Sequence, residues 1–111
     1  MIRKKILIAD DSEINRAILA NMLSRDFDIM EAADGRETIE ILRNYRHELS
    51  ALLLDVVMPE MDGFEVLEKM KRREWTDDLP VIMISVETGN SFIDHAFSLG
   101  ASDYISRPFV P

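Results

Sequence analysis

Short apolar runs alternate with longer segments of helical periodicity along the whole chain. The runs span residues 5–9, 28–32, 51–54, 80–84 and 103–105, and each has the length of a β-strand. Runs that are apolar at nearly every position are buried on both faces, which is typical of a parallel sheet. The pattern therefore predicts an α/β fold in which right-handed crossovers build an open, doubly wound, five-stranded parallel sheet.

Four helical segments separate these strands. The first follows Ser12, a residue suited to cap it; the second spans 37–45, the third begins at Phe64, and the fourth spans 91–99 before Gly100. Apolar side chains in these segments recur three or four positions apart, which predicts one core-facing side for each helix. The positions with this spacing are Ile14, Ala17, Ile18, Met22, Leu23, Ile39, Leu42, Tyr45, Phe64, Leu67, Met70, Phe92, Ala96 and Leu99.

The predicted sheet has one helix fewer than its two faces require. The sequence ends at Pro111, where a fifth helix would begin, so we expect the last helix to be absent or truncated. We predict that residues 1–111 form one domain and are the N-terminal part of a longer protein. A homodimer partner or an output domain would then cover the surface that the last helix leaves open.

Composition excludes several classes of function. There is no cysteine, so disulfides and cysteine-based zinc sites are excluded. The formal net charge of −8 argues against binding to nucleic acid or to an anionic membrane surface. The sequence also has no apolar run near the roughly 20 residues that cross a bilayer. We expect a cytoplasmic protein.

Acidic side chains stand where two of the predicted strands end. Asp10 and Asp11 close the first strand and Asp55 closes the third. A single aspartate at a strand end is usually a turn residue or a helix cap, but the carboxyl ends of parallel strands share one edge of the sheet, where ligands bind. Three converging carboxylates repel one another unless a cation balances them. Oxygen ligands with room for water favour Mg²⁺.

Several motifs in register resemble the receiver domains of bacterial two-component systems. They are Asp10-Asp11-Ser12, the strand ending at Asp55, the block Met58-Pro59-Glu60-Met61-Asp62-Gly63, and then Ser85, Tyr104 and Arg107-Pro108-Phe109. The likeness extends from Ile6 to Phe109 and is greatest to chemotaxis receivers. It implies a flavodoxin-like strand order of 2-1-3-4-5.

The resemblance also implies a role for each site residue. Asp55 would accept a phosphoryl group from a sensor histidine kinase or a phosphotransfer protein. Asp11, Asp55 and the backbone carbonyl of Val57 would bind Mg²⁺ directly, and Asp10 would bind it through a water molecule. The metal would neutralise charge on the transferring group and align the attack. The domain would thus catalyse only its own phosphorylation and dephosphorylation.

The remaining residues of the resemblance would sense the phosphoryl group. Ser85 would hydrogen-bond one of its oxygens, Arg107 would supply a positive charge, and Tyr104 would rotate inward as Ser85 moves, which changes a protein-interaction surface. Taken alone, Ser85 and Tyr104 could equally be a strand-end cap and a packing residue.

Two positions depart from the family pattern. Arg107 stands where the family usually has lysine, and arginine is longer, planar and not equivalent to it. Val86 stands where the family usually has a small residue, so we expect slow hydrolysis of the acyl phosphate. The Arg107-Pro108 bond is expected to be cis by analogy.

Two other functions stay open. The departures at Arg107 and Val86 and the short C-terminus favour, to some degree, a receiver-like interaction module that is independent of phosphate. An aspartyl-phosphate phosphatase on a similar fold is less favoured, because such enzymes place a nucleophile and an acid two residues apart after the first strand, and here Asp10 and Asp11 are adjacent. Trp75, in a polar stretch, is expected to fold onto the third helix rather than to contact a partner.

Overall fold

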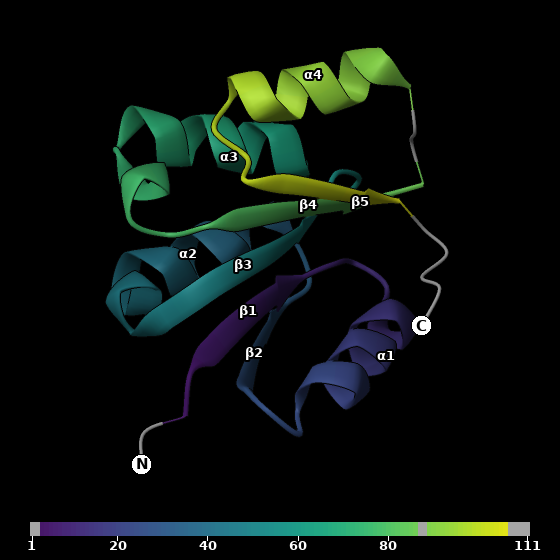
Figure 1. Ribbon diagram of the computed structural model, residues 1–111, viewed down its shortest axis with the longest axis vertical. Helices are drawn as coiled ribbons and strands as arrows, with labels where there is room; N and C mark the ends of the chain where they lie inside the picture. The colour runs from purple at the N-terminus through teal and green to yellow at the C-terminus, as the bar shows by residue number, and fades with distance from the viewer. Residues whose placement is uncertain (1–2, 87–88, 107–111) are drawn as a thin grey trace.

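Five parallel strands form one sheet in this computed structural model, which describes residues 3–86 and 89–106. The sheet has the order β2-β1-β3-β4-β5 (Figure 1). The strands are β1 (Lys5–Ala9), β2 (Asp28–Ala32), β3 (Leu49–Asp55), β4 (Val81–Ser85) and β5 (Asp103–Ser106). All four neighbouring pairs are parallel. The predicted fold class and strand order are therefore confirmed.

Capping side chains set where the helices begin. The helices are α1 (Glu13–Leu23), α2 (Gly35–Tyr45), α3 (Gly63–Arg72) and α4 (Asn90–Ser98), with short 3₁₀ turns η1 (Arg46–Glu48) and η2 (Trp75–Asp77). Ser12, Asp34 and Asp62 each accept a hydrogen bond from the backbone N–H three residues later, which satisfies a donor that the helix leaves unpaired. Ser12 is thus the cap that the sequence predicts.

Two glycines are required by backbone geometry. Gly100 follows the end of α4 with φ +102°, a left-handed conformation that glycine adopts without steric cost. Gly63 begins α3 so close to β3 that a Cβ atom there would overlap the carbonyl oxygen of Asp55. The start of α3 is therefore packed directly against the end of β3, which carries one of the predicted site residues.

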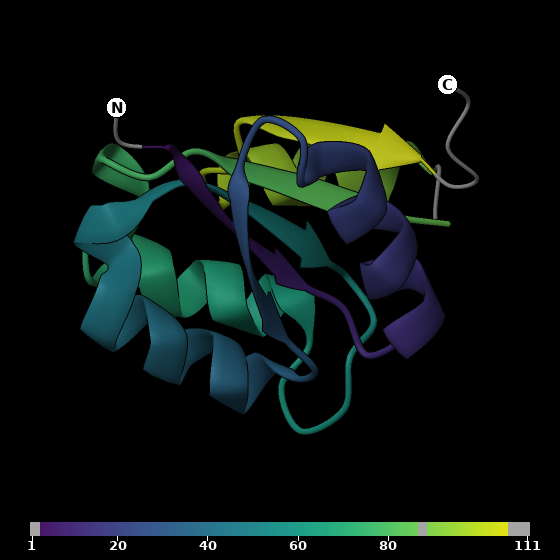
Figure 2. The same cartoon turned by 90° about the horizontal axis from the view of Figure 1, so that it is seen from below.

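The core lies on both faces of the sheet. One face packs against α2, α3 and α4 through a large cluster that includes Leu42, Leu67, Met70 and Ala96. The other packs against α1 alone through a smaller cluster around Leu19. Figure 2 shows α2 and α3 side by side below the sheet, with α1 apart from them. Because consecutive strand residues point to opposite faces, the continuous apolar runs supply both clusters.

The predicted core face of α1 is wrong at four positions, because Ile14, Ala17, Ile18 and Met22 are all exposed. Ile14, Ile18 and Met22 are 73%, 48% and 51% exposed, and Leu19 is the buried residue of this helix. The spacing is helical, but among residues 3–86 and 89–106 α1 is the only helix on its side of the sheet, so only one edge of it packs against the strands. Tyr45, the last residue of α2, is also exposed, because the chain turns into η1 there.

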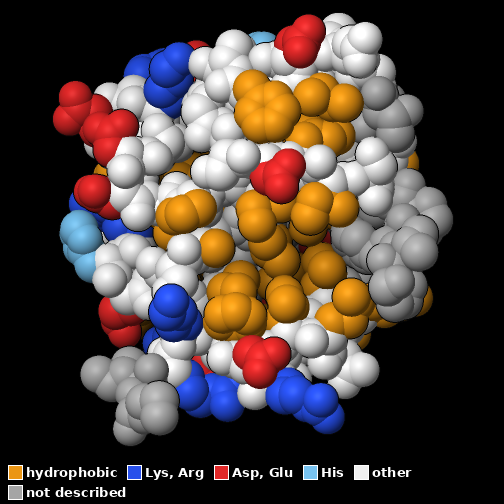
Figure 3. All heavy atoms as spheres, viewed as in Figure 1, with side chains coloured by type: hydrophobic (Ala, Val, Ile, Leu, Met, Phe, Trp, Pro, Cys, Tyr) orange, Lys and Arg blue, Asp and Glu red, His pale blue; other side chains and the backbone are white. Residues whose placement is uncertain are grey.

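An apolar groove lies beside α1, where the sequence predicts a missing helix. No fifth α-helix occurs within residues 3–86 and 89–106. The groove has a volume of about 270 Å³, and hydrophobic side chains gather in the middle of the face in Figure 3. Its lining is entirely apolar and consists of Ile6, Leu19, Met22, Leu23, Ala51, Leu53, Ile82, Ile84 and Ile105. In the described part of the chain, no helix is long and apolar enough to span a membrane.

Candidate functional site

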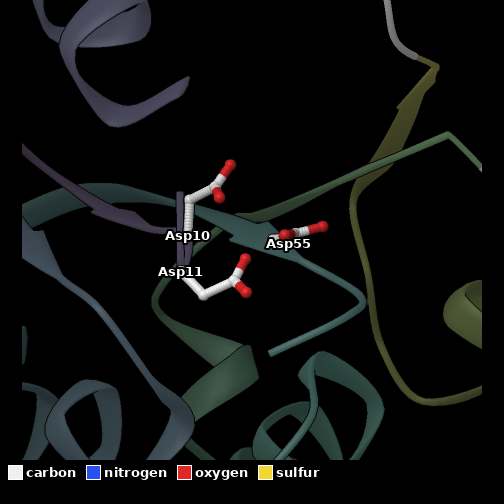
Figure 4. Close-up of side chains that lie close together, drawn as sticks. All are labelled: Asp10, Asp11 and Asp55. Carbon is white, nitrogen blue, oxygen red and sulfur yellow. The ribbon is translucent and has the colours of Figure 1, made fainter. Parts of the chain in front are cut away.

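Three aspartates meet at the carboxyl edge of the sheet. Asp10 and Asp11 directly follow β1, and Asp55 is the last residue of the neighbouring strand β3. The register pairs Ala9 with Leu54, so Asp10 and Asp55 are the next residues of the two strands, and Asp11 follows Asp10. One carboxylate oxygen from each lies within 4.8 Å of the others, and Figure 4 shows the three side chains close together beyond the strand ends. The predicted convergence is confirmed.

The three carboxylates differ in exposure. Asp10 is 1% exposed and its Oδ1 accepts a hydrogen bond of 2.8 Å from the Ser12 N–H. Asp55 is 5% exposed, and its Oδ1 accepts a long hydrogen bond of 3.4 Å from the Val57 N–H. Asp11 is exposed to solvent. The cluster is thus a partly buried acidic site with one open side, formed by Asp11.

Burial changes the acidity of Asp55. The pKa of its carboxyl is raised from an ordinary 3.8 to about 6, mainly by desolvation and also by the nearby charge of Asp11, while backbone hydrogen bonds from Val57 and Val56 act to lower it. Desolvation disfavours the charged form because few dipoles replace the lost water. A cation at this edge would favour the ionised form, and so would lower the pKa.

The donor set suits a hard divalent ion. The side-chain ligands near one another are three carboxylates, and they include neither sulfur nor imidazole. Val57 follows two residues after Asp55 and is 61% exposed, so its backbone is near the open side of the site. Mg²⁺ prefers oxygen ligands and keeps several of its waters, which fits a site with one exposed carboxylate.

Arg16 supports the acidic cluster, and the sequence analysis missed it. Its Nη1 donates a hydrogen bond of 2.6 Å to the backbone carbonyl of Asp10, and its Nε donates one of 3.1 Å to Glu31. The side chain is only 16% exposed. It therefore ties α1 to the ends of β1 and β2. The available signal was its position early in the helix that follows the acid pair, where a long cation can reach back.

The remaining predicted residues lie on neighbouring strands. Ser85, the last residue of β4, is 1% exposed, and Val56 donates a backbone hydrogen bond of 3.3 Å to Ile84, which holds β4 beside the end of β3. Tyr104 is half-buried on β5 opposite Met83. Arg107 and its bond to Pro108 lie outside the described residues.

A family model for the response regulator receiver domain matches residues 6–111. The chain belongs to this family. Receiver domains are the signalling modules of two-component systems, and this one resembles chemotaxis receivers. It is 35% identical over 109 residues to a chemotaxis protein CheY homolog from Campylobacter jejuni, with 96% of this chain and 83% of that protein covered. It is 36% identical over 109 residues to chemotaxis protein CheY1 of Helicobacter pylori, with 96% and 87% covered.

Solved receiver structures have the same fold. Chemotaxis protein CheY4 of Vibrio cholerae superimposes with a TM-score of 0.88 at 27% identity, covering 99% of this receiver and 91% of that chain. A chain of the CheX–CheY–BeF3–Mg²⁺ complex from Borrelia burgdorferi superimposes with a TM-score of 0.87 at 30% identity, covering 98% and 81%. In the Borrelia burgdorferi complex, CheY is present together with CheX, BeF3 and Mg²⁺.

Proposed function

We propose that this receiver accepts a phosphoryl group on Asp55 and uses it to switch a protein-interaction surface. The donor is the phosphohistidine of a sensor kinase or phosphotransfer protein. The observation that carries this proposal is the cluster itself: a buried Asp55 lies with Asp10 and Asp11 so that their carboxylate oxygens are within 4.8 Å of one another. Such a concentration of negative charge lowers stability unless a cation compensates it.

The proposed metal ligands are those that the resemblance to receiver domains implies, and the proximity of the three aspartates supports them. Asp11, Asp55 and the Val57 carbonyl would hold Mg²⁺ directly, and Asp10 would hold it through water. When bound, the ion supplies positive charge that offsets the negative charge of the carboxylates and the phosphoryl group. The contact of Arg16 with the Asp10 carbonyl keeps the backbone of the acid pair in place for this task.

Asp55 is suited to act as the nucleophile. Its ionised carboxylate attacks phosphorus, a new oxygen–phosphorus bond forms, and the nitrogen–phosphorus bond of the donor histidine breaks, with the imidazole as leaving group. Burial at the sheet edge excludes most water, which favours transfer to the carboxylate over hydrolysis. Because only the ionised form attacks, phosphorylation should decrease as the pH falls below the pKa of Asp55.

The proposed switch involves β4 and β5. The Ser85 hydroxyl would donate a hydrogen bond to a phosphoryl oxygen, since Ser85 ends the strand next to Asp55. Tyr104 would then rotate inward and change the surface that α4 and β5 form. Its half-buried position on β5 supports this, because such a ring can occupy either an exposed or a buried state. Arg107 would contribute positive charge to the phosphoryl group.

Further partners are part of the same proposal. The apolar groove beside α1 is where we expect a homodimer partner or an output domain to pack, with residues 1–111 as the N-terminal part of a longer protein. Its entirely apolar lining supports a macromolecular contact. The domain is proposed to remain in the cytoplasm.

A phosphoryl mimic tests the function directly. Beryllofluoride with Mg²⁺ should shift amide NMR signals of Asp55, Ser85 and Tyr104, and Asp55→Asn should abolish these shifts. Asp94→Asn on the exposed side of α4 is the matched control and should respond like the wild type. If the wild type shows no change with saturating Mg²⁺ and beryllofluoride, the receiver is instead a phosphate-independent interaction module. Val86, 65% exposed beside Ser85, is the described feature that favours this second function.

A further inference from the structure

The groove between α2 and α3 is basic, although the molecule is strongly acidic. The formal net charge of the chain is −8. Four cations line this α2–α3 groove, namely Arg36, Arg43, Lys69 and Arg73, against a single acid, Glu40. The groove has a volume of about 280 Å³. Its charge is therefore opposite in sign to that of the whole protein.

The four cations have no ion-pair partner within the described ranges 3–86 and 89–106. Four of the eight other Lys and Arg side chains there are paired: Arg3 with Asp28, Lys5 with Glu48, Arg16 with Glu31 and Arg72 with Glu68. Glu40 lies one helical turn from Arg36, yet the two do not form a salt bridge. The positive charge of the groove is thus available to a ligand.

The side chain of Arg73 is held at one end of the groove by Trp75. The guanidinium carbons of Arg73 and Arg46 lie 5.0 Å and 4.6 Å from the centroid of the Trp75 ring, within the range of a cation–π contact. Beyond Arg73, a second cleft also contains the acids Glu74 and Asp78. The excess of positive charge therefore ends at Arg73, and the contacts with Trp75 restrict where this guanidinium can lie.

We propose that the α2–α3 groove docks an acidic segment of a partner protein. Arginine presents a fork of donors that matches a carboxylate, and Arg36, Arg43 and Arg73 are exposed at the groove. The base of the groove includes the buried Ile39 and the half-buried Met61, so an apolar side chain can insert between flanking carboxylates. A bare phosphate would use the cations but not this apolar base.

This surface is independent of the proposed phosphorylation. It is formed by α2, α3 and Met61, whereas the proposed switch uses β4, β5 and α4. The overall negative charge repels acidic partners at long range, but charges are screened over about 8 Å at 0.15 M salt. The local cations therefore decide which acidic segment binds.

A synthetic peptide that alternates glutamate and leucine tests the proposal on the 111-residue chain. Trp75 is the single tryptophan of the chain, so its fluorescence reports on the end of the groove. We expect saturable binding, with amide NMR shifts in α2 and α3, that weakens as salt is added. Replacing glutamate by glutamine in the peptide should abolish binding. Arg43→Glu should weaken binding by about tenfold or more, since a charge-assisted hydrogen bond is lost.

Arg25→Glu is the matched control, because it changes the net charge by the same amount at an exposed position outside the groove. Its affinity for the peptide should stay within about twofold of the wild type. The proposal is overturned if the peptide does not bind saturably at low salt, or if Arg25→Glu weakens binding as much as Arg43→Glu. It is also overturned if inorganic triphosphate binds to the groove and the peptide does not, because the natural ligand would then be a small phosphorylated molecule.

Discussion

Asp55→Asn should stabilise the metal-free receiver at neutral and alkaline pH. The substitution keeps the shape of the side chain and removes a charge that is only 5% exposed. Burial raises the pKa of Asp55 from 3.8 to about 6, and one pH unit between the folded and unfolded values is worth about 1.4 kcal/mol. The ionised carboxylate therefore costs about 3 kcal/mol of folding free energy. We expect the variant to gain up to this amount at pH 8.

The sign of the pH dependence follows from proton binding. Below about pH 3.8 the Asp55 carboxyl is protonated in both states, so wild type and variant should have nearly equal stability. Between pH 3.8 and about 6 the folded state holds the proton while the unfolded state loses it. As the pH rises through this window, the free energy of unfolding of the wild type therefore falls relative to that of the variant. Above the window the difference stays constant.

Urea unfolding at several pH values, in the presence of a chelator, measures the difference. Asp94→Asn, at an exposed position, is the control and should change the free energy of unfolding by less than about 0.5 kcal/mol. Adding Mg²⁺ should stabilise the wild type at pH 8, by about 2.7 kcal/mol at one hundred times the dissociation constant, and should stabilise Asp55→Asn much less. If wild type and Asp55→Asn unfold in parallel from pH 4 to 8, the charge of Asp55 is not buried as described.

Three further substitutions probe the site. Gly63→Ala should destabilise the fold by about 1–3 kcal/mol and weaken the beryllofluoride response, because its Cβ would overlap the Asp55 carbonyl oxygen. The control is Gly89→Ala, whose Cβ would meet nothing closer than 3.8 Å. Equal melting temperatures for the two variants would contradict this prediction. Arg16→Met should cost about 1.5–3 kcal/mol in urea unfolding and reduce Mg²⁺ affinity in calorimetry, and an unchanged affinity would remove the supporting role of Arg16. Val86→Ala should lose phosphate from Asp55 faster than the wild type when the phosphoprotein is followed by mass spectrometry, and an equal rate would show that Val86 does not shield the acyl phosphate.

The fold and the position of the acidic site could be predicted because both depend on local patterns. Apolar runs that end in aspartate define the strands, and parallel pairing alone brings Asp10, Asp11 and Asp55 to one edge. Helix starts were predictable at Ser12 because its capping bond is local. These features need no knowledge of what packs on the sheet.

The features that could not be predicted depend on packing between distant elements. The periodicity of Ile14, Ile18 and Met22 indicates a helix, but whether that apolar side is buried depends on a neighbouring element, and the described part of the chain places no helix beside α1. The contact of Arg16 with the Asp10 carbonyl requires α1 to fold back over the strand ends. The excess of cations between α2 and α3 likewise arises only when Arg36 and Arg43 come to face Lys69 and Arg73 across the groove.

The acidic site is destabilising for the protein alone, and that is a reason to regard it as functional. A buried Asp55 whose pKa is raised by burial and by Asp11 lowers stability at neutral pH, whereas an asparagine would fit the same space. The Arg16 guanidinium contacts the backbone carbonyl of Asp10 and the side chain of Glu31, which fixes the start of α1 against the strand ends. The chain therefore holds three acids close together at the edge of the sheet. Such an arrangement gains stability from a bound metal ion, and its stability should consequently report on the occupancy of the site.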